Sequence, residues 1–212
     1  NSYPSSALLK AIMMNSADDL GTDGPDYANG FGNLNIGGSI EIIDSSRFFV
    51  GSLNHLANQN HVINVPANLG QLKVMVYWND VAASPASAKA LINDIDMNVS
   101  TPGGGTVFPL VLNSDPLYVL DPAVPGVDHL NNVEQVVINN PQSGNYTVNL
   151  SGFNIPSGTQ DYVVVYSFLK KDIEIVYPSK GVSVEAGVPN DIHWQVLGNS
   201  GSFTVELSTD NG

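Results

Sequence analysis

The stretch Tyr146-Thr147-Val148-Asn149-Leu150 alternates apolar and polar side chains, and this alternation decides the fold class. A period of two residues is typical of a β-strand with one wet face and one buried face. Similar short runs lie on both sides of it, separated by turn signals such as Pro141-Gln142-Ser143-Gly144. The expected strands are His61–Val65, Leu72–Trp78, Asp96–Ser100, Val107–Leu112, Val133–Ile138, Tyr146–Leu150 and Tyr162–Phe168. The pattern predicts a mainly β fold, an antiparallel jelly roll or β-sandwich over residues 47–170.

Residues 1–46 have a helical pattern instead. Pro4 suits a first helical position with Ser2 as a nearby cap, and glycines from Gly21 to Gly24 end this first pattern. Two short helices are too small to fold alone, so their apolar faces must be buried against the following domain or against a part of the protein outside this sequence. The apolar positions with helical spacing are Leu8, Leu9, Ile12 and Met13 in the first helix, and Ile36, Ile40 and Ile43 in the second, which Gly37 and Gly38 weaken.

Residues 171–212 form a third segment after the boundary Lys170-Lys171-Asp172. Four short strands are expected there, about half of an immunoglobulin-like or fibronectin-like sandwich. They are Ile173–Tyr177, Val182–Glu185, Asp191–Val196 and Phe203–Leu207. The sequence stops at Asp210-Asn211-Gly212, a hairpin-turn signal, so we expect this third domain to be truncated.

Charge and composition narrow the possible partners. The chain has 7 Lys and Arg against 20 Asp and Glu, a net charge of −13, which makes nucleic acid and anionic membranes poor partners. Cysteine is absent, so a disulfide framework and a thiolate metal site are excluded. No apolar run is long enough to span a bilayer. We expect a monomeric secreted or cell-surface protein.

Four stretches resemble one protein family. Pro4-Ser5-Ser6-Ala7-Leu8-Leu9-Lys10-Ala11 resembles the penultimate helix of subtilisin-like catalytic domains, and Gly30-Phe31-Gly32-Asn33-Leu34-Asn35 resembles the turn into their last helix. The family usually has alanines where this chain has Gly37 and Gly38. Leu72–Asp80 and Asn131–Ile138 are similar to the jelly roll that follows the catalytic domain in one branch of bacterial subtilases, a domain related to the P domain of proprotein convertases.

This resemblance implies the C-terminal part of a bacterial secreted subtilisin-like serine protease. In that family the catalytic serine precedes the penultimate helix, where this sequence begins, and no Gly-Thr-Ser or Gly-x-Ser-x-Gly motif is present. We therefore expect no catalytic and no cofactor-binding residue here, and an inactive chain whose partner is its own upstream catalytic domain, which would cleave protein substrates. The residues expected to pack the jelly roll on the last helices are Leu8, Ile12, Ile40 and Phe48 or Phe49.

The acidic residues contain the best candidate site. No Lys or Arg lies between Lys89 and Lys170, and in a strand Asp94 and Asp96 project to the same face. Carboxylate and amide oxygens are the ligands that calcium prefers, and the cation supplies the missing positive charge. The resemblance points the same way, because such subtilases often bind calcium in the jelly roll. The candidate metal ligands are Asp94, Asp96, Asp128, Asn131 and Glu134, with Asn132 nearby. The alternative is that Asp94 caps a turn and Asp96 is solvated.

Two other functions stay open. A carbohydrate-binding or adhesive module would present exposed aromatic side chains on one face. Its candidates are Tyr77, Trp78, Tyr118 and Trp194, although Trp78 and Trp194 are expected to face a core. The third function is an architectural spacer without a ligand. The histidines His55, His61 and His193 fit no common zinc spacing and are interpreted as strand or surface residues.

Overall fold

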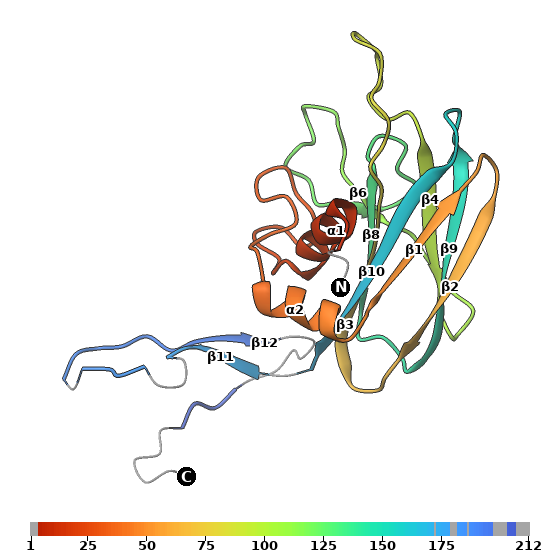
Figure 1. Cartoon of the computed structure of the whole chain (residues 1–212). Coiled ribbons are helices and arrows are strands. Elements are labelled where there is room, and N and C mark those ends of the chain that lie inside the picture. Colours follow the sequence, from red (N-terminus) through yellow and green to blue (C-terminus); the bar gives the residue numbers. More distant parts are fainter. Residues whose placement is uncertain (1–3, 172, 179–181, 186, 197–202, 207–212) are drawn as a thin grey trace.

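The computed structural model describes residues 4–171, 173–178, 182–185, 187–196 and 203–206. Two four-stranded antiparallel sheets lie face to face (Figure 1), which confirms the predicted sandwich. The first sheet has the order β1 (Phe48–Leu53), β10 (Gln160–Lys170), β3 (Leu69–Tyr77) and β8 (Val133–Asn139). The second has the order β2 (Asn58–Val65), β9 (Gly144–Asn154), β4 (Asp94–Ser100) and β5 (Thr106–Val107). Two further short strands, β6 (Leu110–Val111) and β7 (Val124–Pro125), pair with each other.

The main core lies between the two sheets. In β9 the side chains of Tyr146, Val148 and Leu150 are buried, whereas Thr147 and Asn149 face outward, as the alternation predicts. In β3 nearly every side chain is buried, because its outer face is covered as well. Trp78 is fully buried and donates its indole N–H to the backbone oxygen of Asn93 (2.8 Å). The core therefore continues past the end of β3 to the start of β4.

Two helices precede the sandwich, as expected. Helix α1 (Ser6–Ser16) is capped by Ser5 rather than by Ser2, because the Ser5 hydroxyl accepts a hydrogen bond from the Leu8 N–H (3.2 Å). Helix α2 (Ile36–Asp44) is capped by the Asn35 side chain, which accepts from the Gly38 N–H (2.7 Å). This cap offsets the low helix propensity of the two glycines. A Cβ at Gly38 would also lie tightly against Ser16 of α1, so a small residue suits this crossing.

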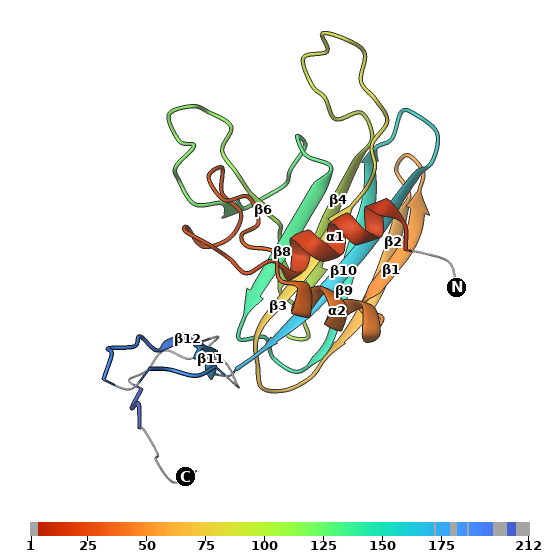
Figure 2. The same ribbon diagram turned by 60° about the vertical axis from the view of Figure 1, so that its left-hand side comes forward.

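The helices cover the outer face of the first sheet over β3 and β10 (Figure 2). A second, smaller core forms there, and its buried residues are Leu8, Ala11, Ile12, Ile42, Tyr77, Val163 and Val165. Leu8 and Ile12 thus confirm the expected packing, and Phe48 contacts the same core. Ile40 does not, because it is 52% exposed and the inward positions of α2 are Ser39 and Ile42. Phe49 packs on the main core instead.

The C-terminal segment has fewer strands than expected. β11 (Ile173–Tyr177) pairs antiparallel with β12 (His193–Val196). The described residues 182–185 and 203–206 are not in strands, so two of the predicted strands are wrong as far as they are described. Trp194, expected to face a core, is 42% exposed. The turn signal at 210–212 lies outside the described residues. In the part of the chain that the structure covers, no helix has the length and apolarity that a bilayer crossing requires.

Candidate cation site

Two aspartates of β4 and one histidine form the centre of an acidic cluster. Asp94 and Asp96 stand on either side of a register shift between β4 and β9, which brings both carboxylates toward the loop before β8. The Nδ1 atom of His129 in that loop lies 3.1 Å from Asp94 Oδ2 and 3.4 Å from Asp96 Oδ1. One ligand atom from each of the three residues lies within 4.8 Å of the others. This spacing would allow the three to share one metal ion.

A third carboxylate reaches the cluster from the opposite sheet. Glu134 of β8 is buried, and its Oε2 accepts a hydrogen bond from the Met97 N–H of β4 (2.7 Å). Burial raises the pKa of the Glu134 carboxyl well above its usual range, the Met97 bond opposes this rise, and the negative charges of Asp96, Asp128 and Asp94 add to it. Burial also raises the pKa of Asp96, which His129 partly opposes. The protein holds these acids close together at an electrostatic cost.

Unpartnered buried atoms point to a cation. Among the described residues, the buried side-chain atoms without a hydrogen-bond partner are Asp94 Oδ1, Asp96 Oδ1, His129 Nδ1 and Glu134 Oε1. The first three belong to the group of Asp94, Asp96 and His129, and Glu134 is bonded to the Met97 N–H next to Asp96. His129 Nδ1 is close to two carboxylates without hydrogen-bond geometry. Buried polar groups normally have partners, since an unsatisfied one costs about 1–3 kcal/mol. The Lys89 ammonium, 3.2 Å from Asp94 Oδ2, supplies part of the needed positive charge from a half-exposed position.

Two of the predicted ligands have another local role. Asp128 Oδ1 accepts from the backbone N–H groups of Leu130 (2.7 Å) and Asn131 (3.2 Å), and its Oδ2 accepts from Asn131 Nδ2 (2.7 Å). Asp128 and Asn131 therefore fix the loop that presents His129. Asn132 donates to the backbone oxygen of Trp78 (2.6 Å). Of the predicted ligands, Asp94 and Asp96 have atoms that meet, and Glu134 bonds to the backbone beside them. His129 was not predicted as a ligand, because only the folded loop brings it to the two aspartates.

The cluster is suited to holding a divalent ion. The atoms that converge come from two carboxylates and one imidazole. Carboxylate oxygens suit calcium, magnesium or manganese, whereas an imidazole nitrogen suits zinc and other transition metals. The ring of His129 stacks on Phe153 of β9 with centroids 4.2 Å apart, and the His129 side chain is 39% exposed.

In the described residues no hydrogen bond joins a serine hydroxyl to a histidine ring.

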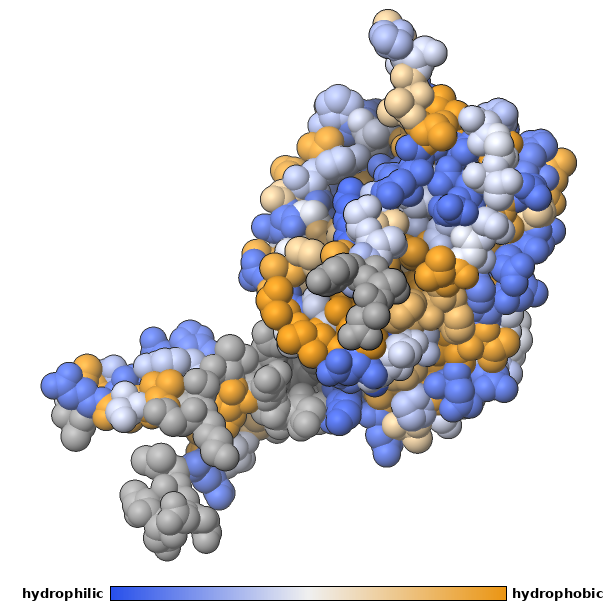
Figure 3. All heavy atoms as spheres, in the orientation of Figure 1, coloured by the Kyte–Doolittle hydropathy of each residue, from blue (hydrophilic) through white to orange (hydrophobic). Residues whose placement is uncertain are grey.

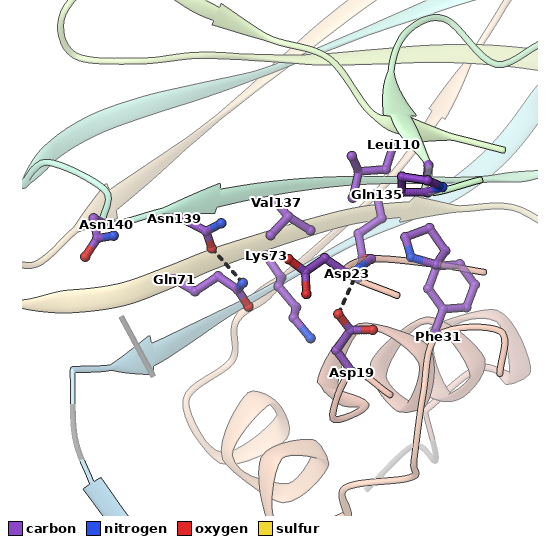
Figure 4. Close-up of a pocket in the computed structure, with 14 residues that line it drawn as sticks. Asp19, Asp23, Phe31, Gln71, Lys73, Leu110, Gln135, Val137, Asn139 and Asn140 are labelled. Carbon is purple, nitrogen blue, oxygen red and sulfur yellow. Dashed lines mark hydrogen bonds between the residues drawn. The ribbon is translucent and has the colours of Figure 1, made fainter. Parts of the chain in front are cut away.

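A separate polar cavity of about 670 Å³ lies on the outer face of β3 and β8 (Figure 4). Its floor contains Lys73, whose buried ammonium donates to the Ala17 carbonyl oxygen (2.9 Å). Burial lowers the pKa of Lys73, and the charges of Asp19 and Asp18 oppose this. Gln71 Nε2 donates to Asn139 Oδ1 (2.8 Å) along the same floor. The polar side chains here largely satisfy one another or the end of α1.

The aromatic and histidine candidates are mostly structural. Tyr77 and Trp78 are buried, which removes them as sugar-stacking residues, while Tyr118 (47% exposed) and Trp194 (42%) lie on different segments. His61 packs on Phe49 with ring centroids 4.5 Å apart and shares a hydrogen bond with the Tyr162 hydroxyl (2.9 Å). Burial lowers the pKa of His61. His55 accepts from the Ile155 N–H (3.2 Å).

Comparisons with known proteins add one distant relative. The serine protease/ABC transporter B family protein tagA of Dictyostelium discoideum is 26% identical over 171 residues, covering 76% of this chain. The chain spans only 10% of the length of that protein. No family model matches. Among solved structures, the propeptide form of Bacillus licheniformis lipase BlEst2 is 15% identical with a TM-score of 0.35, covering 58% of this chain and 22% of the lipase chain, a likeness too slight to support an argument.

Proposed function

We propose that this chain is the non-catalytic C-terminal region of a bacterial, secreted subtilisin-like serine endopeptidase, and that it stabilises the catalytic domain of the same polypeptide. The observation that carries the proposal is the helix pair α1 and α2, which has one apolar face on the sandwich and a second apolar face open to solvent. Similarity to a protein named as a serine protease supports the protease part of this proposal.

The second face has exposed apolar side chains on both helices. Its apolar side chains are between 41% and 55% exposed, and apolar residues gather over α2 in the space-filling view (Figure 3). Burying the exposed half of such a side chain contributes about 1 kcal/mol. Contiguous exposed apolar side chains are typical of an interface rather than of a free surface. The residues of this outer helix face are Leu9, Met13, Ile36, Ile40 and Ile43.

The partner that fits this face is the body of the catalytic domain. The helices resemble the last two helices of that domain, so in the complete enzyme they would be packed on both sides. Ile12 and Ile42 face the sandwich. Ile36 and Ile40, which are exposed here, would face the catalytic core. The sandwich then braces the catalytic domain through elements that belong to it. Peptide-bond hydrolysis would take place upstream, and the polypeptide would act as a monomer once this face is covered.

Calcium is the proposed ligand of the acidic cluster. Asp94, Asp96 and Glu134 would hold it, and Asp128 and Asn131 would keep the neighbouring loop in place. Calcium prefers oxygen ligands, so the half-exposed His129 would be the member that yields its place. The ion would supply a positive charge that neutralises the acids and ties β4 to β8, one strand from each sheet. Its contribution here is structural.

The proposal is tested by coexpressing the chain with the polypeptide encoded directly upstream of Asn1. An Asp, His and Ser triad in subtilisin order is expected there, together with a stable complex. The double variant Ile36→Asn/Ile40→Asn should weaken the complex about tenfold or more while the melting temperature of the chain alone changes little, because both side chains are exposed. Leu56→Asn, at an exposed turn position elsewhere, is the matched control. A missing triad, or equal binding by both variants, refutes the proposal.

A further inference from the structure

The outer face of the second sheet carries a regular array of short, uncharged polar side chains. Along β9 the outward positions alternate with the buried ones, and the pairing of β2 and β4 with β9 places equivalent residues in rows across the three strands. The rows are Asn58, Ser151 and Asp96; Asn60, Asn149 and Asn98; Val62, Thr147 and Ser100; and Asn64 with Asn145. We call these positions the amide face.

Hydrogen bonds within the amide face orient its side chains. Asn149 Nδ2 donates to Asn98 Oδ1 (2.8 Å) and to the Ser100 hydroxyl (3.0 Å). At the other end, Asn64 Nδ2 donates to Asn145 Oδ1 (2.9 Å). Each amide has two donors and one acceptor oxygen, so donors and acceptors remain directed to solvent after these bonds. Side chains that are already ordered lose less conformational entropy when a ligand binds.

The chemistry of the amide face excludes several ligand classes. The whole chain carries a net charge of −13, yet Asp96, at one corner, is the sole charged residue of the face. With no Lys or Arg, the face offers nothing to phosphates, sulfates or carboxylates. It also lacks the apolar centre that protein interfaces require, since Val62 is its single aliphatic residue. A ligand that matches it must be neutral and rich in hydroxyl groups.

We propose that the amide face binds a neutral polysaccharide along β9. Asparagine amides can donate to one sugar hydroxyl and accept from its neighbour, and Thr147 and Ser100 add hydroxyls of their own. Phe153 continues the same face of β9, is 46% exposed and is held by stacking on His129, so it offers an apolar surface to a sugar ring. From Asn145 to Phe153 the strand extends about 26 Å, enough for several sugar units in a row.

This binding differs from the proposed bracing of the catalytic domain. The helices lie on the first sheet and the amide face lies on the second, on the opposite side of the sandwich (Figure 2). Both surfaces can therefore be occupied at the same time. A protease anchored in this way would be held on a glycan matrix while it acts on proteins, and the helix face is not needed for the glycan contact.

The test is retardation of the purified chain in native gels that contain neutral polysaccharides: a β-1,4-glucan, a β-1,3-glucan, a xylan, a mannan and an α-glucan. We expect retention on at least one, and about a tenfold or greater loss of affinity in Asn60→Ala/Asn149→Ala, because each lost hydrogen bond weakens binding several-fold. The matched control is Gln71→Ala/Asn139→Ala, which removes an amide pair of similar geometry on the other sheet, at the cavity floor. A melting curve of each variant verifies its folding.

Should the double variant fail to fold, Asn60→Ala alone serves the same purpose, since this side chain is exposed and is not part of the hydrogen bonds from Asn149 to Asn98 and Ser100. Retention that falls in the amide-face variants and persists in the control supports the proposal. Three results would overturn it: no retention on any of the five neutral gels, retention only on polyanions such as alginate, or a loss confined to the Gln71/Asn139 control, which would place the glycan in the cavity instead.

Discussion

Replacing Asp94 by alanine should abolish any stabilisation of this protein by calcium. The Asp94 side chain is 2% exposed and carries one of the unpartnered oxygens, so it is the ligand whose loss the other members can least replace. Extracellular calcium sites have dissociation constants of about 0.1 to 1 mM. At 10 mM calcium such a site stabilises the folded state by about 1.4 to 2.7 kcal/mol, since the gain is RT ln(1 + [L]/Kd).

For a chain of this size that gain corresponds to a rise in melting temperature of about 3 to 10 °C relative to protein in excess chelator. Differential scanning calorimetry of the wild type should show this rise, and Asp94→Ala should reduce it to below about 1 °C. Asp161→Ala removes an exposed carboxylate of β10 and should keep the full shift. Identical melting curves with calcium and with chelator in the wild type would refute the calcium assignment, as would a calcium shift that survives in Asp94→Ala.

Three further predictions test other parts of the account. The pKa of Glu134 is raised in the folded protein, so the folded state binds more protons than the unfolded state. In chelator, the free energy of unfolding measured by urea titration should therefore fall as pH rises from 5 to 8, and Glu134→Gln should flatten this slope. An unchanged slope in the variant would show that Glu134 is not the group responsible. Lys73→Met should lower the free energy of unfolding by about 1 to 3 kcal/mol and speed proteolysis of the segment between α1 and α2, because it removes the hydrogen bond to the Ala17 carbonyl oxygen. Lys170→Met, at an exposed site, should lower it by less than about 0.5 kcal/mol. Equal effects of the two variants would show that the Lys73 bond does not stabilise this segment. Gly32→Ala should lower the free energy of unfolding by more than about 3 kcal/mol, because φ is +103° and a Cβ would overlap the Asp18 carbonyl. Gly104→Ala is the control: its φ is +84° but the space around it is open, so the same urea titration should show a loss of only about 1 to 2 kcal/mol.

The sandwich could be predicted from local sequence, but one of its strands could not. The period-two pattern predicted β9 because that strand has one buried and one wet face. β1 was missed because Gly51 interrupts its apolar run and lowers its strand propensity. The structure explains this glycine: a Cβ there would collide with the Tyr162 hydroxyl group on the neighbouring strand β10. A contact over such a sequence distance leaves no local signal.

The prediction that Ile40 packs on the sandwich was wrong for a related reason. Helical spacing predicts that Ile36, Ile40 and Ile43 lie on one face, and they do, but that face points away from the sandwich. Ile42 faces inward with Ser39, whose hydroxyl is hydrogen-bonded to Ser16 of α1 (2.8 Å). A periodic pattern gives the apolar side of a helix without saying which neighbour covers it.

The candidate cation site was predictable in part. The spacing of Asp94 and Asp96 along one strand suggested a shared face, and both carboxylates do approach His129. Glu134 lies near β4 only because the two sheets pack face to face. His129 lies near the aspartates because Asp128 fixes the loop that carries it. The sequence shows the acids, whereas only the fold shows which of them remain without partners.

The bracing role of the sandwich is tested by the thermal inactivation of the complete protease, assayed by casein hydrolysis, with and without residues 47–212. The proposed function predicts that removal of the sandwich shortens the half-life of the activity about tenfold or more at a temperature near the melting point of the intact enzyme. Ile36→Asn/Ile40→Asn should shorten it as well. An unchanged half-life in the truncated enzyme, or peptide-bond hydrolysis by the isolated chain, would contradict it.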